Sequence, residues 1–161
     1  MTRKLFFSII MLSVFAACNS KSAFDYSQDI VKKEQSLVPE ISITETKIGG
    51  FAANKQYDSI AAAGSRMEKL VDDKLNEIKN QPAPDVKESA VFKDATLKYF
   101  RFIKSMYTVY REFGSAASDD ARETAMHKLQ QLVEEKTAAI NDMQRAQKNF
   151  ADANGFKLEN K

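Results

Sequence analysis

Apolar residues recur at three- and four-residue steps along most of the chain after its N-terminal segment, with polar and charged residues between them. This spacing is typical of amphipathic helices. Short breaks divide the pattern, which predicts four helices over about 22–48, 55–79, 85–113 and 118–153. Residues 41–44 alternate as in a strand, but no partner strand is evident, so we interpret them as part of the first helix.

The first predicted helix carries a start signal, a flaw and a stop signal. Ser22 with Asp25 three residues later fits a capping box. Pro39 removes a backbone hydrogen bond and clashes with the preceding turn, so it predicts a kink or break just before it. The pair Gly49 and Gly50 predicts the C-terminal stop.

The second and third predicted helices also have residues that signal where they start and end. Asn54 is the predicted cap of the second helix, whose small residues 61–64 would let a neighbouring helix approach closely. Residues 81–84 contain two prolines and predict a break. The third helix is predicted to end at Gly114.

The last two helices differ in character. The third has the most aromatic residues and is the predicted central core helix. The fourth is predicted to start at the cap Ser118 and to close at Asn154 and Gly155. It is the longest of the four, so part of it can project. Its predicted apolar stripe consists of Met126, Leu129, Leu132, Val133, Ala139, Ile140, Met143, Ala146 and Phe150.

Four amphipathic helices joined by short breaks have few packing solutions. The simplest is an all-α, antiparallel up-down four-helix bundle, with the first helix kinked near Pro39. The composition agrees, since the chain has no tryptophan, only five glycines and three prolines. One domain is predicted.

The N-terminal segment has a different pattern. Arg3 and Lys4 precede an apolar run over residues 5–15, which Ala16 and Ala17 follow. The run is within the ~7–15 residues of a signal-peptide core and shorter than the ~20 that span a bilayer as a helix. These residues therefore predict a cleaved export signal.

The only cysteine, Cys18, comes immediately after this segment. Residues 14–18, Val-Phe-Ala-Ala-Cys, resemble the lipobox of bacterial lipoproteins, with Phe15 where leucine is usual. The resemblance implies a diacylglycerol on the Cys18 thiol, cleavage before it and acylation of the new N-terminus. The alternative is a free thiol beside an ordinary cleavage site at Ala17, although exported proteins usually pair or avoid thiols.

The lipobox resemblance divides the chain into four parts. Residues 1–17 are the signal peptide, 18–22 the lipidated N-terminus and short tether, 23–155 the bundle and 156–161 a flexible tail. In the sorting scheme of enterobacterial lipoproteins, Asn19 favours the outer membrane. The periplasmic and the surface face both fit.

The charge balance excludes one class of partner. Two of the 24 basic residues lie in the leader, which leaves 22 basic residues against 22 acidic ones. A neutral domain gives no electrostatic reason to bind nucleic acid, so none is expected.

Catalytic and cofactor motifs are sparse. The one histidine, His127, stands four residues after Glu123, which we interpret as an exposed pair and not as half of a metal site. A haem would have to use His127 with a methionine, namely Met67, Met106 or Met143, which we interpret as core residues. The sequence predicts no enzyme, cofactor or metal, with a bundle that holds a small ligand, haem or metal as the alternative function.

One possible interaction surface lies on the third helix. Tyrosine and arginine dominate protein interface hot spots, so these side chains could line a groove for a protein, glycan or apolar ligand. Core packing is the preferred interpretation of the tyrosines. The candidate residues are Tyr99, Arg101, Lys104, Tyr107, Tyr110 and Arg111.

Overall fold

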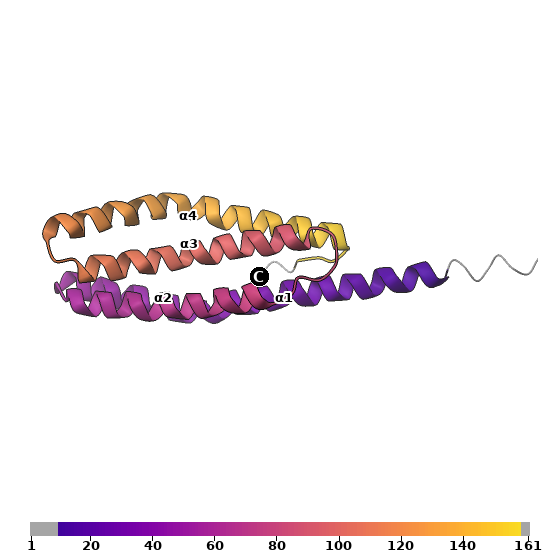
Figure 1. The fold of residues 1–161 in the computed structure, drawn as a ribbon, viewed down its shortest axis with the longest axis horizontal. Helices are drawn as coiled ribbons and strands as arrows, with labels where there is room; N and C mark the ends of the chain where they lie inside the picture. The colour runs from indigo at the N-terminus through magenta and orange to yellow at the C-terminus, as the bar shows by residue number, and fades with distance from the viewer. Residues whose placement is uncertain (1–9, 159–161) are drawn as a thin grey trace, which may run out of the picture.

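The structure, a computed structural model, describes the backbone of residues 10–158 and the side chains of residues 20–158. This part of the chain forms four α-helices (Figure 1). They are α1 (Ile10–Ala53), α2 (Tyr57–Asn80), α3 (Ser89–Ser115) and α4 (Asp119–Asn154).

The helices pack in the order in which they follow one another. Each contacts the next, and α4 returns to contact α1, so the predicted up-down four-helix bundle is confirmed. The α2–α3 interface is the most extensive and the α1–α4 interface the least. Figure 1 shows that α1 extends beyond the other helices at its N-terminal end, next to the α2–α3 loop.

Two glycines allow α2 and α3 to approach each other closely. A Cβ atom at Gly64 would lie 2.6 Å from the backbone nitrogen of Arg111, and one at Gly114 would lie 2.5 Å from the carbonyl oxygen of Tyr57. Neither position has room for a methyl group. The glycines are reciprocal, since Gly64 of α2 faces the α3 backbone and Gly114 of α3 faces the α2 backbone. The close approach predicted from residues 61–64 is therefore confirmed.

The predicted stop at Gly114 is wrong, because α3 continues to Ser115 and the glycine serves as a packing residue inside the helix. The predicted stop at Gly49 and Gly50 is also wrong, because both residues lie inside α1 with no heavy atom within 4 Å of an added Cβ. A glycine near a helix end is compatible with either role, and the neighbouring helix decides which one it takes.

α1 ends instead at a Schellman turn built around Lys55. Lys55 has a left-handed φ of 53°, and the amide of Gln56 donates to the carbonyl of Phe51 at 2.9 Å. α2 then begins after Gln56, which makes no side-chain cap, so the predicted cap at Asn54 is wrong. The Asn54 amide donates back to the Gly50 carbonyl at 2.8 Å.

The predicted start of the first helix at Ser22 is wrong as well, because α1 already runs from Ile10. A capping box satisfies orphan amides, and amides inside a continuous helix bond to the preceding turn. Of the predicted kink or break at Pro39, the break is absent, since α1 is helical on both sides of the proline, and the kink stays a prediction. Pro39 and Gln35 are exposed, so water can reach the carbonyl that the missing N–H leaves free.

The start of α3 and both ends of α4 agree better with the boundaries predicted from the sequence. The break at residues 81–84 is confirmed, although α3 starts at Ser89, after Glu88 in a left-handed conformation with φ 60°. Ser118 caps α4 by accepting from the Ala121 amide at 3.2 Å, and Gly155 closes the helix with φ 72°. Both signals are local to the chain.

The core is filled by large apolar side chains, and aromatic rings concentrate at the end where α1 enters the bundle. The rings of Phe92 and Phe150 stack with centroids 5.0 Å apart, and Tyr26 meets both edge-on. Phe156, the first residue of the predicted tail, packs against Phe150 and Phe24. The fully buried side chains of the whole core include Ile30, Leu37, Ile60, Met67, Val71, Ile78, Phe92, Phe100 and Phe150.

The predicted stripe of α4 is only partly buried. Met143 and Phe150 are buried, whereas Met126 and Val133 are exposed, the latter by 55%. The helix therefore has buried anchors near its two ends, Ala125 being the one at the start, and a poorly covered middle.

The glycines permit a matched stability test. Gly64→Ala should lower the free energy of unfolding by about 2 kcal/mol, because the clash with the Arg111 backbone outweighs the ~1 kcal/mol gain in helix propensity. A Cβ atom added at Gly49 or Gly50 has no heavy atom within 4 Å, so Gly49→Ala and Gly50→Ala should each raise the free energy of unfolding by about 0.5 kcal/mol. Urea denaturation of the three variants checks this, and equal effects at all sites would contradict the close contact.

Candidate functional site

The three tyrosines of the candidate surface point into the bundle. Tyr107 is only 2% exposed, and Tyr99 and Tyr110 are half-buried. The Tyr99 hydroxyl donates to the Glu34 carboxylate at 2.9 Å, and the Tyr110 hydroxyl donates to the Glu45 carboxylate at 3.0 Å. The rings therefore do not form one exposed aromatic patch.

These two hydrogen bonds, which we name the tyrosine clasps, have the same geometry. Each joins residues 65 positions apart, and the partners are separated by eleven residues on both helices. Eleven residues are about three turns of helix, or ~16 Å. The constant offset means that α1 and α3 run parallel and in register, as the first and third helices of an up-down bundle must.

The clasps were not predicted from the sequence, although a signal for them exists. Glu34 and Glu45 repeat at the same spacing as Tyr99 and Tyr110. Burial, followed by the charge and hydrogen bond of the glutamate, raises the pKa of Tyr99 and of Tyr110 well above the ordinary value. Both hydroxyls therefore stay protonated and remain hydrogen-bond donors.

The basic members of the candidate surface are divided between α2 and solvent. The Arg111 guanidinium donates to Glu68 at 2.7 Å, and the Lys104 ammonium donates to Asp72 at 2.6 Å. Arg101 is exposed. A partner that contacts these basic side chains stays a prediction. Tyr99 lines the depression between α3 and α4 described below, but Tyr107 and Tyr110 do not line it, so the three rings do not share that groove.

The Glu68 carboxylate of α2 accepts hydrogen bonds from two side chains of α3, Arg111 and Thr108. Burial raises its pKa, but hydrogen bonds from Arg111 and Thr108 and the nearby positive charges outweigh burial, so the net pKa lies below the usual value. Its side chain is 21% exposed, which limits solvent screening. The Thr108 hydroxyl donates to Glu68 at 2.9 Å, which adds a second bond from α3.

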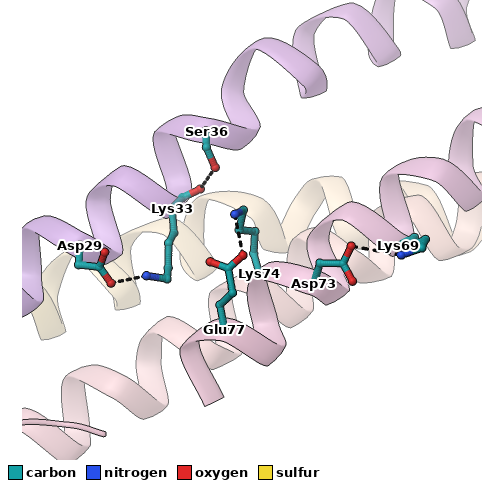
Figure 2. A network of polar contacts seen from close by, with 7 residues as sticks. All are labelled: Asp29, Lys33, Ser36, Lys69, Asp73, Lys74 and Glu77. Atoms are coloured by element: carbon teal, nitrogen blue, oxygen red, sulfur yellow. Dashed lines mark hydrogen bonds and ion pairs between the residues drawn. The ribbon is translucent and has the colours of Figure 1, made fainter. Parts of the chain in front are cut away.

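Several other charged groups pair within single helices, while Arg66 with Glu40 and Lys128 with Glu112 join neighbouring helices. Figure 2 shows Lys33 with Asp29 on α1, and Lys69 with Asp73 on α2, each four residues apart. The hydrogen bond from Lys33 is the main reason that the pKa of Asp29 is lowered. The Lys33–Asp29 pair is part-buried, whereas the Lys69–Asp73 pair is exposed. An exposed pair of this kind contributes only a few tenths of a kcal/mol.

The groups weighed for metal or haem binding lie apart. His127 and Glu123 are 3.7 Å apart on the exposed face of α4, as interpreted from the sequence. Met67 and Met143 are buried core residues and Met106 is half-buried. Within the described residues, no three histidine, cysteine, aspartate or glutamate side chains lie in an arrangement that could hold a metal ion.

Surface depressions lie at two places on the described part of the bundle. One, of about 340 Å³, lies where α1 meets the α2–α3 loop and is lined by Ser22, Asp25, Tyr26 and residues 81–84. The Tyr26 hydroxyl is buried there without a hydrogen-bond partner, and burial, with the charge of Asp29, raises its pKa to about 12. The other, of about 540 Å³, lies between α3 and α4.

The predicted lipidation site lies at the edge of the described part. The backbone of Cys18 belongs to α1, five residues before Ala23, which is the first buried residue within 20–158. Residues 18–22, predicted as a tether, are helical. The side chains of the lipobox, and residues 1–9 altogether, lie outside the described residues.

Comparison with known proteins adds no relative. The chain matches no family model, no curated protein and no solved structure. None of the described helices is long and apolar enough to cross a membrane.

Removing a tyrosine hydroxyl should have different effects on stability at Tyr110, whose hydroxyl is hydrogen-bonded, and at Tyr26, whose hydroxyl has no partner. Tyr110→Phe should lower the free energy of unfolding by about 1 kcal/mol, because the hydrogen bond from the Tyr110 hydroxyl to the Glu45 carboxylate is lost. Tyr26→Phe removes a buried hydroxyl without a partner and should leave stability unchanged or higher. Denaturation of both variants, with a double-mutant cycle of Tyr110→Phe and Glu45→Gln, measures the difference. A coupling of zero would contradict the Tyr110 clasp.

Glu68 predicts a pH dependence. Its folded pKa is lowered, so its contribution is complete at neutral pH and is lost as the pH falls through that folded pKa. Glu68→Gln should therefore be less stable than the native protein by about 1 kcal/mol at pH 7, with a gap that closes on acidification. Asp73→Asn, which breaks an exposed pair, is the control and should change stability little. A gap that is constant with pH would contradict the role of the charge.

Proposed function

We propose that the protein is a bacterial lipoprotein, held on a cell-envelope membrane by acyl chains on Cys18, whose helical bundle binds or scaffolds another envelope component without catalysis. The observation that carries the proposal is the order of features in the first eighteen residues. Basic residues, an apolar run, two alanines and the only cysteine of the chain follow one another without interruption.

The binding free energy of such a lipid anchor is enough to hold the protein on a membrane. Each buried methylene group contributes about 0.8 kcal/mol, and a single acyl chain binds only marginally, so the several chains of a lipoprotein make attachment durable. The bundle then needs no membrane-binding surface of its own to stay attached. Asn19 favours the outer membrane as the location.

The interior of the bundle supports a binding or structural role over a ligand-holding one. The space between the helices is occupied by side chains such as Phe92, Phe100 and Phe150, all fully buried. A haem or apolar ligand would have to displace this packing. The outer faces carry the charged pairs of Figure 2, which suit contacts with polar surfaces.

The anchor predicts both a mass and a location. Full-length protein extracted from bacterial membranes should begin at Cys18 and carry added acyl mass, because the lipobox directs cleavage and acylation at that thiol. Cys18→Ser should remain uncleaved or unlipidated and lose the acyl mass. Intact-mass spectrometry together with membrane fractionation measures both properties.

A second variant distinguishes position from mere presence of a thiol. Adding Ser22→Cys to Cys18→Ser restores a cysteine but not the one that follows Ala16 and Ala17, so it should not restore lipidation. A native product that begins elsewhere without acyl mass would overturn the proposed function. Acylation at residue 22 would overturn the specific role of the lipobox position.

A further inference from the structure

We infer that one end of the bundle, formed by the α2–α3 loop and residues 154–158, rests against the lipid headgroups, so that the bundle stands on the membrane with its opposite end outward. The inference depends on the proposed lipid anchor. We name these residues, with the first turns of the bundle in α1, the anchor end. The turns at residues 54–56 and 116–118 form the distal end.

The first step is the continuity of α1. Its backbone is helical from Cys18 into the bundle without a break, and Ala23, the first buried residue among the side chains that the structure describes, follows five residues later. Five residues of helix span ~7.5 Å. A flexible linker would let the bundle swing away from its anchor, but a helix of this length holds the bundle next to it.

The second step is that the anchor end is tied to this part of α1. The Phe24 ring packs edge-on against Phe156 with centroids 5.7 Å apart. The Asn154 amide donates to the carbonyl of Lys87 in the α2–α3 loop at 2.9 Å. Figure 1 shows this loop and the end of α4 side by side where α1 extends from the bundle. The loop and the C-terminal segment therefore face the same way as the anchor.

Charge does not provide the contact. The anchor end exposes Lys21, Lys87 and Lys157, and it also exposes several acids. Those acids are Asp25, Asp85, Glu88 and Asp152. With both signs interspersed, attraction to anionic lipid is weak, so the acyl tether sets the orientation and the lipid composition has little influence.

The orientation places the distal end far from the bilayer. α2 alone has 24 residues, which corresponds to ~36 Å of helix. The turns around Lys55 and Ala117 would stand at that height above the headgroups. An envelope partner that approaches from the aqueous side meets this end and the outer helix faces first.

The test measures the depth of single labels on the acylated full-length protein. Lys87→Cys and Lys157→Cys place a fluorophore at the anchor end, and Ala117→Cys places it at the distal end; all three residues are exposed. Cys18 is blocked by its lipid, so the introduced thiol is the one labelled. The protein is reconstituted in neutral phosphatidylcholine vesicles containing a lipid with a nitroxide on its headgroup.

The labels at residues 87 and 157 should lose most of their emission, and the label at 117 should retain it. Adding phosphatidylglycerol should leave this pattern unchanged. Equal quenching at both ends, or none at either end of an acylated, vesicle-bound protein, would overturn the orientation while leaving the anchor intact. A protein without acyl mass would overturn the anchor and the orientation together, and the mass spectrum distinguishes the two failures.

Discussion

The close contact between α2 and α3 is the constraint on which the rest of the structure depends. Gly64 and Gly114 each face the backbone of the opposite helix, so the two helices fit at one height only. A shift by one residue along either helix would place a side chain where there is no room for a Cβ. This pair provides the most extensive interface, and α1 and α4 are added to its outside.

The added helices are held by different interactions. α1 presents Glu34 and Glu45 to the tyrosines of α3, and its register follows from these hydrogen bonds because their spacing is the same on both helices. α4 is held near its ends, most strongly where Phe150 stacks on Phe92, and its middle exposes Val133. Local opening is therefore easiest in the middle of α4, where few apolar contacts oppose it.

The sequence allowed the helix count, the bundle and the α4 caps to be predicted, because these depend on local spacing and on side chains close in the chain. It failed where the role of a residue depends on another helix. Gly49 and Gly114 look alike as stop signals, yet one meets open space and the other meets a backbone. Tyr99 and Tyr110 are interpreted from the sequence as core residues, with a groove as the alternative, but their bonds to Glu34 and Glu45 were not predicted because these acceptors lie 65 residues away.

The helix that leads to the proposed anchor is also one of the two outer helices of the bundle. Ile30 and Leu37 are buried against the bundle, and the Tyr99 clasp to Glu34 lies on the same face of α1. Any force between a membrane anchor and a partner at the distal end must pass from α1 to the other helices through these contacts. Sliding of α1 along α3 must break both clasps, because they join the same two helices at points eleven residues, or ~16 Å, apart. Under the proposed anchored function, this resistance to sliding transmits force from α1 to the other helices.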